Sequence, residues 1–480
     1  MAARGTNGWT DRRVMLLIAG TMFMEILDGT ILATAAPRMA QVFGVTAPQI
    51  AITITGYLVT MAVLIPLSGW LADRYGARTV FVFGIAVFTV ASGLCAASQS
   101  LPELIALRIV QGIGGALMVP VGRMVVLRST DRSGLVRAVA FLTWPALVAP
   151  IAAPLAGGAL TTYLSWRWIF LVNVPLGVAA VACAVRLVPQ TYGEVRSALD
   201  WGGFAFSTTC LGGVVVAAAA LGAPSVDWPL VAVSAAVAAV TGAAGVRHLL
   251  GVGDPLLDLR LFRIDTFRMS HTSGSLFRCT INAVPFLLPL LFQEGFRWTA
   301  VKSGAVLLAL FVGNLGIKPL TTPILRRLGF RSVLVAADVV AALTMVLCGL
   351  LAEHTPLVAI LALLVVSGAA RSVGFTAYTT IAFADIEPGE MRHANTIAST
   401  AQQAAIGVGA ALGAVAVRFG AFTTPALGAG SATPAYRTAF MIIAAITLVG
   451  AGQALRLRRD GGAELVPARP GAASRTGVAR

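Results

Sequence analysis

The sequence predicts an all-α protein that crosses a membrane many times. Its 480 residues are 57% hydrophobic and only 11% charged, whereas soluble domains average about 25% charged residues. This composition excludes most soluble enzymes, secreted domains and disordered chains. Fourteen apolar runs have the roughly 20 residues that a membrane-spanning helix needs. They are 14–36, 50–72, 79–98, 102–127, 137–160, 168–187, 201–222, 228–247, 270–293, 303–325, 332–352, 355–380, 394–417 and 437–456.

The basic residues indicate how these spans are oriented. Of 35 lysines and arginines, 24 fall on the side that also holds both chain ends, six on the other side, and five inside spans. Because basic residues collect on the cytoplasmic side, we expect both termini in the cytoplasm and the spans in the plasma (inner) membrane. The net charge of +15 is then explained by the orientation of the spans in the membrane. No basic stripe with interleaved aromatics is present, so we expect no nucleic-acid partner.

The spans divide the chain into two bundles with additional helices between them. We expect a cytoplasmic tail (1–13), a six-helix bundle (14–187), two linker helices (201–247), an interfacial amphipathic helix (255–268), a second six-helix bundle (270–456) and a disordered cytoplasmic tail (460–480). The cysteines and histidines are scattered without metal-ligand spacing, and no GxxxxGK[ST] loop occurs. The sequence therefore predicts no metal, no cofactor and no enzymatic activity.

A short internal repeat relates the two bundles. Pro66 and residues 73–78 match Pro319 and residues 326–331, 253 positions later, and Arg326 stands where the first copy has Asp73. Each copy ends one span and enters a short basic turn. Repeated halves are typical of secondary transporters, whose substrate site lies between the halves near the bilayer midplane.

Motifs of the first half carry a family resemblance. Residues 69–78, GWLADRYGAR, resemble the loop signature of the major facilitator superfamily between its second and third helices. Segments 27–31 with 36–37, 108–116, 145–158, 166–177 and 200–203 are similar, in order, to motifs of its fourteen-helix drug:proton antiporter branch, and weaker matches follow at 261–263 and 402–403. The chain departs from the pattern at Ala153, where the branch usually has glycine. The resemblance implies two six-helix bundles plus two extra helices, and proton-coupled efflux.

Three charges inside the first and fourth spans are the candidates for proton coupling. With a rise of about 1.5 Å per residue, Asp28 and Arg108 lie in one layer of the membrane, and Glu25 lies about a turn deeper. Burial favours the protonated form of a carboxyl group, whereas a nearby arginine favours the ionised form. An arginine that moves would therefore switch proton affinity, although a static buried salt bridge is the alternative.

The turn after the second span is the candidate gate. Short inner turns can latch two bundles together through ion pairs and helix ends, and topology alone does not require an acid there. The arginines of the turn could serve topology alone. The gating candidates are Asp73, Arg74, Gly76 and Arg78.

The fifth span is the candidate hinge. Proline removes a helical hydrogen bond and kinks a helix, and paired glycines allow close approach of a neighbouring helix. Elevated proline and glycine content is common in membrane helices, which is the simpler explanation. The hinge candidates are Pro145, Pro150, Pro154, Gly157 and Gly158.

Candidate substrate contacts lie near the helices that line the central cavity in the resembling family. Aromatic side chains can hold apolar or cationic compounds by stacking or cation–π contact, and ordinary packing is the alternative for each. These candidates are Phe23, Tyr57, Gln111, Phe141, Trp144 and Asn282. The sequence assigns no role to four charges of the second half: Arg278, Lys318, Asp338 and Arg371.

Together these features predict a monomeric, proton-coupled exporter of hydrophobic or amphipathic small molecules that works by alternating access. Its partners would be the substrate, protons and the lipid bilayer. A proton-coupled importer would carry similar acids and stays open as an alternative. A non-transporting sensor or scaffold with the same fold is the second alternative, but it would not need charges buried in one layer or a proline-rich helix.

Overall fold

The computed structural model describes residues 12–45, 47–130, 134–143, 145–193, 198–222, 225–423, 433–458 and 461–462. Every regular element in these ranges is a helix, which confirms the predicted all-α class. The first bundle comprises α1 (Arg12–Phe43), α2 (Ala47–Tyr75), α3 (Ala77–Ala97), α4 (Leu101–Arg128), α5 (Leu135–Thr143), α6 (Pro145–Tyr163), α7 (Trp168–Leu171) and α8 (Asn173–Leu187).

The remaining helices form a connecting pair and a second bundle. The pair is α9 (Trp201–Gly222) and α10 (Trp228–Gly251). The second bundle comprises α11 (Asp265–Leu290), which continues into the short π-helix η3 (Leu291–Gly295), then α12 (Ala300–Gly316), α13 (Lys318–Gly349), α14 (Leu357–Ile381), α15 (Met391–Thr423) and α16 (Thr433–Ala454).

Twelve described helices are long and apolar enough to cross a membrane. The expected span 137–160 is built from two shorter helices, α5 and α6, on either side of residue 144, which lies outside the described residues. The expected span 303–325 is divided between α12 and the first part of α13, and the rest of α13 forms the span expected next. The number fourteen therefore stays a prediction.

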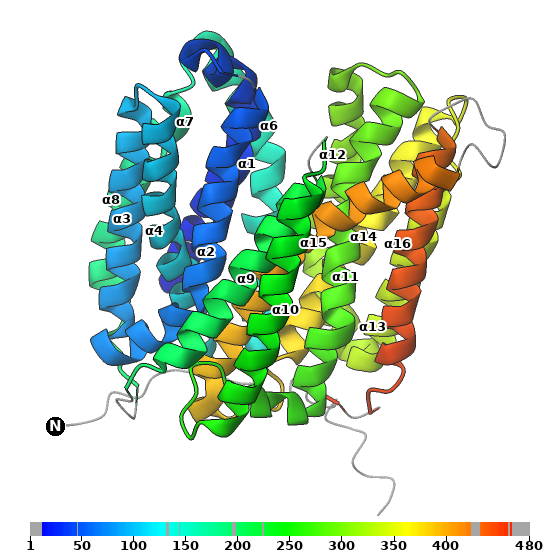
Figure 1. Ribbon diagram of the computed structural model, residues 1–480. Coiled ribbons are helices and arrows are strands. Elements are labelled where there is room, and N and C mark those ends of the chain that lie inside the picture. The colour runs from blue at the N-terminus through cyan, green and yellow to red at the C-terminus, as the bar shows by residue number, and fades with distance from the viewer. Residues whose placement is uncertain are drawn as a thin grey trace, which may run out of the picture.

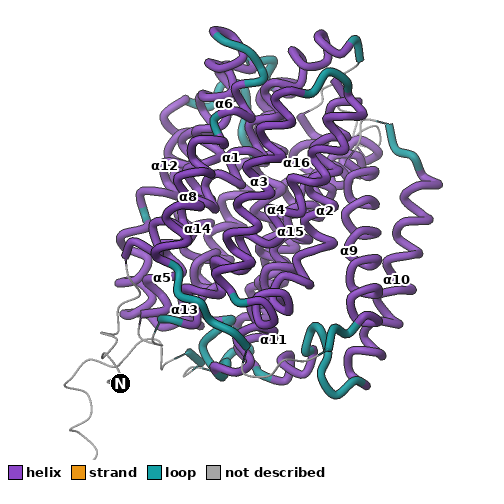
Figure 2. The backbone as a smooth tube through the Cα atoms, turned by 90° about the vertical axis from the view of Figure 1, so that its left-hand side faces the viewer, coloured by secondary structure: helices purple, strands orange, loops and turns teal. Residues whose placement is uncertain are grey.

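The two bundles stand side by side, with the first in blue and cyan and the second in green to red (Figure 1). Helix α9 contacts both α2 and α15, so it touches both bundles, and α10 packs on α9. Figure 2 shows this pair along one edge of the molecule. Only 17% of the apolar window of α10 is buried inside the protein, so its remaining apolar residues face the membrane.

Glycines allow the close helix contacts of the first bundle. A Cβ atom at Gly114 would lie 2.5 Å from the backbone nitrogen of Phe88, and a Cβ atom at Gly112 would lie 2.9 Å from the carbonyl oxygen of Tyr57. Small residues let membrane helices approach at backbone distance. The glycines of segment 108–116 thus fix α4 against α3 and α2, with Arg108 on the same helix.

The internal repeat corresponds to a repeated backbone turn. Gly76 has a φ angle of 92° and Gly329 a φ angle of 74°, a left-handed region that favours glycine. Gly76 separates α2 from α3, and Gly329 interrupts α13 at the matching position. The predicted gate glycine therefore has a structural role as the pivot of a tight turn.

The expectation of an interfacial helix over 255–268 is wrong. The segment holds a 3₁₀ helix, η2 (Leu259–Arg263), and its last residues already belong to α11, which begins at Asp265. The Asp258 carboxylate caps η2 by accepting a hydrogen bond from the Arg260 N–H at 2.9 Å. Leu256 and Leu257 are buried at 4% and 7% exposure, so they pack into the protein. The description of α1 begins at Arg12, within the last two residues of the expected first tail. Residues 463–480 of the second tail lie outside the described residues.

Asp200 ties the connecting helices to this segment. Its carboxylate accepts hydrogen bonds from the N–H groups of Gly203 at 2.8 Å and Leu256 at 3.2 Å, and lies 2.7 Å from Nε2 of His248. Burial alone would raise the pKa of Asp200, but these hydrogen bonds outweigh burial and hold the pKa below its ordinary value. Asp200 therefore acts as a clamp between α9, α10 and the segment that follows.

Candidate functional site

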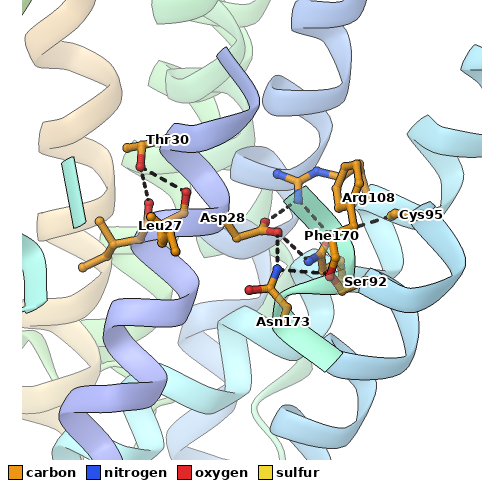
Figure 3. A network of polar contacts seen from close by, with 10 residues as sticks. Leu27, Asp28, Thr30, Ser92, Cys95, Arg108, Phe170 and Asn173 are labelled. Atoms are coloured by element: carbon orange, nitrogen blue, oxygen red, sulfur yellow. Dashed lines mark hydrogen bonds and ion pairs between the residues drawn. The ribbon is translucent and has the colours of Figure 1, made fainter. Parts of the chain in front are cut away.

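Asp28 lies at the centre of a polar network buried within the first bundle. Its Oδ2 is 2.5 Å from NH1 of Arg108, and its Oδ1 accepts hydrogen bonds from Gln111 at 3.0 Å and Asn173 at 2.9 Å. Asp28 is 1% exposed and Arg108 is fully buried. Figure 3 shows the carboxylate of Asp28 on α1 turned toward Arg108 and Asn173. The structure thus brings together the two charges that sequence depth placed in one layer.

A second layer of contacts holds the partners of Asp28. Asn173 also donates to Oγ of Ser92 at 3.1 Å, and Ser92 donates to the carbonyl oxygen of Phe170 at 2.9 Å. Sequence reasoning did not select Asn173 or Ser92 as site residues. Asn173 lies inside segment 166–177, one of the motifs that carry the family resemblance, so that motif was the available signal.

Aromatic rings complete the surroundings of Arg108. Its guanidinium carbon lies 4.2 Å from the ring centre of Tyr57 and 5.8 Å from that of Phe170. The Tyr57 hydroxyl and Nε and NH2 of Arg108 are buried without a hydrogen-bond partner among the described atoms. Buried polar groups without partners are costly, and they mark a site where a changed side-chain position could supply the missing contact.

A cavity of about 280 Å³ lies between the bundles. Side chains of α1, α2 and α4 form one wall, and side chains of α11 to α15 form the other. The volume is near the lower end of the roughly 300–1,000 Å³ of small-molecule pockets. The cavity therefore has the place predicted by the internal repeat, at the interface of the two halves.

Glu25, and not Asp28, faces this cavity. Glu25 is in the cavity lining, whereas Asp28 and Arg108 lie behind the wall, inside the first bundle. No carboxylate–cation pair within 4.0 Å includes Glu25 among the described residues. Arg123 of α4 is the cation whose charge acts on it. The two acids of α1 are thus one turn apart but lie in different environments, Glu25 at the cavity and Asp28 inside the first bundle.

The predicted substrate contacts are mostly elsewhere. Of the six, Asn282 lines the cavity. Tyr57 and Gln111 belong to the Asp28 network, and Phe23 packs against the apolar core of the first bundle. Phe141 is on α5 outside the lining, and Trp144 lies outside the described residues. Proximity to a cavity helix therefore did not predict which face of the helix a side chain occupies.

Three of the four unassigned charges do line the cavity: Arg278, Lys318 and Arg371. Asp338 lies inside the second bundle, where Tyr378 donates a hydrogen bond to it at 2.8 Å. The Tyr378 hydroxyl is also 2.6 Å from Oγ of Ser273. Asp338 is fully buried, so it does not face the lipid headgroups.

Asp73 bridges the two bundles at the end of α2. Its Oδ2 is 2.9 Å from Nε of Arg392, the second residue of α15, and its Oδ1 is 3.0 Å from NH1 of Arg128. Arg392 also lies 3.8 Å from Asp254 in the segment before η2. Nothing in the sequence indicates this pairing, because no local pattern connects residues so far apart.

Two further contacts fasten the same part of α15 to α4. Asn395 donates to the carbonyl oxygen of Pro120 at 2.9 Å, and Arg123 donates to Oε1 of Gln402 at 3.1 Å. Together with the Asp73–Arg392 pair, they join the bundles over the first half of α15. This conformation is therefore held closed at the end of the molecule where α2 turns into α3.

The other gating candidates do not cross between the bundles. Arg74 is exposed and lies over the rings of Trp70 and Tyr75, at 5.5 Å and 6.0 Å from the ring centres. Arg78 is the second residue of α3 and half-buried. Among the predicted gate residues, Asp73 is the one that the structure connects to α15.

The predicted hinge region is divided into two helices. Helix α5 ends at Thr143 and α6 begins at Pro145, and the side chains of Pro145, Pro150 and Pro154 lie outside the described part of the chain. Gly157 is buried, but a Cβ atom at Gly158 would meet nothing within 4 Å. Gly158 therefore makes no close helix contact in this conformation, and the role of the region as a hinge stays a prediction.

Comparisons with known proteins agree with this architecture. The sequence profile of the Major Facilitator Superfamily matches residues 18–410 and, in a second match, residues 272–479. The chain is 34% identical over 410 residues to the protein named MdtD, for multidrug resistance, of Serratia proteamaculans, covering 84% of each chain. It is 33% identical over 427 residues to the MdtD of Pectobacterium carotovorum, covering 88% of this chain and 91% of the relative.

The fold is also similar to a solved structure. The crystal structure of the human organic anion transporter MFSD10 (TETRAN) aligns with a TM-score of 0.62 at 15% identity, covering 92% of this chain and 99% of the other. This likeness concerns the fold alone. The helices, the cavity between two bundles and the profile matches lead to one assignment: the chain belongs to the Major Facilitator Superfamily and is a multi-pass transporter of the inner membrane rather than an enzyme.

Proposed function

We propose that this transporter exports hydrophobic or amphipathic small molecules in exchange for protons, by alternating access. The observation that carries the proposal is the arrangement of two acids on α1. Glu25 faces the cavity, and Asp28 pairs with Arg108 one turn away. The relatives named for multidrug resistance support export of drug-like compounds.

The Asp28 network has the parts that a proton switch requires. A proton on Asp28 would remove the charge that holds Arg108 at 2.5 Å, and Arg108 would keep its hydrogen bond to Oε1 of Gln111 at 2.7 Å. Since Asp28, Ser92, Arg108 and Asn173 come from α1, α3, α4 and α8, a change at this point reaches four helices. A proton that crosses the membrane down a potential of 100 mV would supply about 2.3 kcal/mol of free energy to drive transport.

The closed end supplies the other half of the cycle. On the predicted topology, Asp73 and Arg392 lie on the cytoplasmic side, so their ion pair holds a state that is closed to the cytoplasm. Separation of α15 from α2 and α4 would open the cavity to substrate from that side. Substrate would be released when the contacts between α15, α2 and α4 form again.

Transport into inside-out membrane vesicles tests the proposal. A panel of amphipathic fluorescent compounds is supplied with and without an uncoupler, to wild-type vesicles and to vesicles with Asp28→Asn. We expect uptake that the uncoupler abolishes, and loss of this uptake in Asp28→Asn because the carboxamide cannot take up and release the proton. Asp265→Asn is the matched control, since Asp265 pairs with Arg268 within a single helix.

Each alternative gives a different result. Uncoupler-sensitive uptake in the variant at the wild-type level would contradict the role of Asp28. Accumulation in right-side-out vesicles only would favour an importer. A protein that transports no compound in either orientation would favour a sensor or scaffold.

A further inference from the structure

We infer that the cavity between the bundles is a binding site for an amphipathic anion, such as an aromatic or aliphatic carboxylate or sulfonate. The inference rests on the proposed function for its meaning in transport, because it names the class of compound that the cavity takes. It derives from the charges of the lining, the neutral hydrogen-bond partners of its three arginines and the distribution of charge between the two walls.

The lining of the cavity is cationic. Arg123, Arg278, Lys318 and Arg371 belong to it, whereas Glu25 is the one acid among the described lining residues. Arginine stays protonated in proteins, so three positive charges remain whatever the state of Lys318. The net charge of the lining is positive whether or not Glu25 carries a proton. The preference for an anion therefore does not depend on the protonation state of Glu25.

The hydrogen-bond partners of the three arginines of the lining are all neutral. Arg278 donates to the carbonyl oxygen of Ser270 at 2.9 Å, and Arg371 donates to the carbonyl oxygen of Ile281 at 2.7 Å and to Asn282 at 3.3 Å. Arg123 bonds Gln402. Within the described chain, no carboxylate lies within 4.0 Å of any of the three.

Two other shielded arginines in the described part of the chain do pair with acids. Arg108 has Asp28 at 2.5 Å, and Arg392 has Asp73 at 2.9 Å. An uncompensated charge in a low-dielectric site is costly, and an intramembrane charge marks a functional site by default. The cavity arginines have the environment of cations whose counter-charge arrives with a ligand.

Two unpartnered polar groups strengthen the assignment. The Nε of Arg278 is buried without a hydrogen-bond partner, and so are both amide atoms of Asn314, a lining residue that is 1% exposed. Arg278 can donate more than one N–H group to an oxyanion, and Asn314 can add a neutral donor. An oxyanion bound between α11, α12 and α14 would accept hydrogen bonds from Nε of Arg278 and from the amide nitrogen of Asn314.

The two walls differ in polarity. Arg278, Lys318 and Arg371 come from the second bundle. The first bundle contributes one cation, Arg123, opposed by one acid, Glu25, and apolar side chains that include Met61 and Ile65. A ligand that fills the cavity would therefore place its anionic group against the second bundle and its apolar part against the first. Such a ligand would bridge the two halves that move relative to each other.

Equilibrium binding to the purified full-length protein in lipid nanodiscs tests the inference. The probes are 1-anilinonaphthalene-8-sulfonate and N-phenyl-1-naphthylamine, which has the same aromatic rings without the sulfonate, with empty nanodiscs as the blank. We expect the sulfonate to bind at least about tenfold more tightly than the neutral probe, as a charge-assisted hydrogen bond supports.

Variants separate charge from packing. Arg278→Gln and Arg371→Gln should each weaken sulfonate binding about tenfold or more and leave binding of the neutral probe within about twofold. Arg278→Lys should restore part of the loss, which shows that the folded cavity is intact. Glu25→Gln should tighten sulfonate binding, and exposed Arg38→Gln is the control that should change nothing.

The outcomes distinguish this inference from the proposed function. Equal affinity for the two probes, no binding of the sulfonate, or sulfonate binding that survives both arginine variants would overturn the anion site. Sulfonate binding with these variant effects, in a protein that moves no compound in vesicles, would support the site and overturn the proposed export. Uncoupler-sensitive export without a preference for anions would support the proposed export and overturn the anion site.

Discussion

Removal of the Asp73 charge should release the closed end of the transporter. Asp73→Asn keeps the shape of the side chain but abolishes its ion pairs with Arg392 and Arg128. The Arg128 pair lies within the first bundle. Only the Arg392 pair crosses to the second bundle, so only its loss biases the molecule toward opening between α2 and α15.

The size of the effect follows from burial. The side chains of Asp73 and Arg392 are each 12% exposed, so their pair is screened less than a surface pair, which is worth about 0–1 kcal/mol. Hydrogen bonds to charged groups contribute about 1.5–3 kcal/mol. A loss of about 2 kcal/mol corresponds to a shift of about 30-fold toward the state open on this side.

Alkylation of a cavity cysteine measures this shift. Ser399 lines the cavity and is 9% exposed, so Ser399→Cys should react with a membrane-impermeant maleimide when the cavity opens to the cytoplasm. Inside-out vesicles present that face, and the reaction of the native cysteines is subtracted with the parent chain. We expect Asp73→Asn to raise the rate of reaction about tenfold or more, since the rate follows the open population.

A double-mutant cycle and a matched control make the test specific. If the pair acts as a unit, Asp73→Asn together with Arg392→Gln should react hardly faster than either single variant, with a coupling of about 0.5–3 kcal/mol. Asp265→Asn removes an ion pair whose side chains are 54% and 58% exposed within one helix, and it should have no effect. Unchanged reactivity in Asp73→Asn, or equal acceleration by Asp265→Asn, would refute the reasoning.

Two further predictions concern stability. Alanine at Gly76 or Gly329 must adopt a φ angle of 92° or 74°, so each variant should lose about 1–3 kcal/mol of folding stability and melt at a lower temperature. Gly158→Ala places its methyl group in open space and should melt like the wild type. Equal melting temperatures for all three variants would contradict the turn assignment. The clamp at Asp200 should weaken in acid: because its folded-state pKa is depressed, its stabilisation is present above the ordinary value of about 3.9 and is lost as the pH falls through the lower folded value. Thermal melts from pH 6 to pH 3 should therefore fall more steeply for the wild type than for Asp200→Asn, and parallel curves would exclude the clamp.

The sequence predicted the features that depend on local pattern. Hydropathy located the helices, because about 20 apolar residues are the physical requirement for crossing the bilayer. Depth along the helices placed Asp28 and Arg108 in one layer, and the repeat predicted the turns at Gly76 and Gly329. These inferences needed only helix rise, membrane thickness and the steric freedom of glycine.

The sequence alone does not indicate which residues of distant helices pair with each other. The Asp73–Arg392 pair joins residues from different bundles, and no periodicity indicates it. The face of α1 that carries Glu25 opens to the cavity while Asp28 turns inward, and this follows from the packing of α1 against its neighbours. The segment at 255–268 has the composition of a surface helix, but Leu256 and Leu257 find apolar partners inside the protein, and burial there decides its conformation.

The separation of Glu25 from Asp28 constrains how an anion could be exchanged for protons. An anion bound beside Glu25 would favour a proton on that acid, so anion and proton would bind there together, and a transporter coupled at Glu25 alone would move both in the same direction. Exchange therefore requires the coupled proton at a group that the substrate does not touch, and Asp28 meets this condition because it lies behind the cavity wall. Tyr57 is the side chain whose ring lies 4.2 Å from the Arg108 guanidinium and on which the charges of both acids act. Communication between the two acids would then pass through Tyr57 and the turn of α1 that joins them.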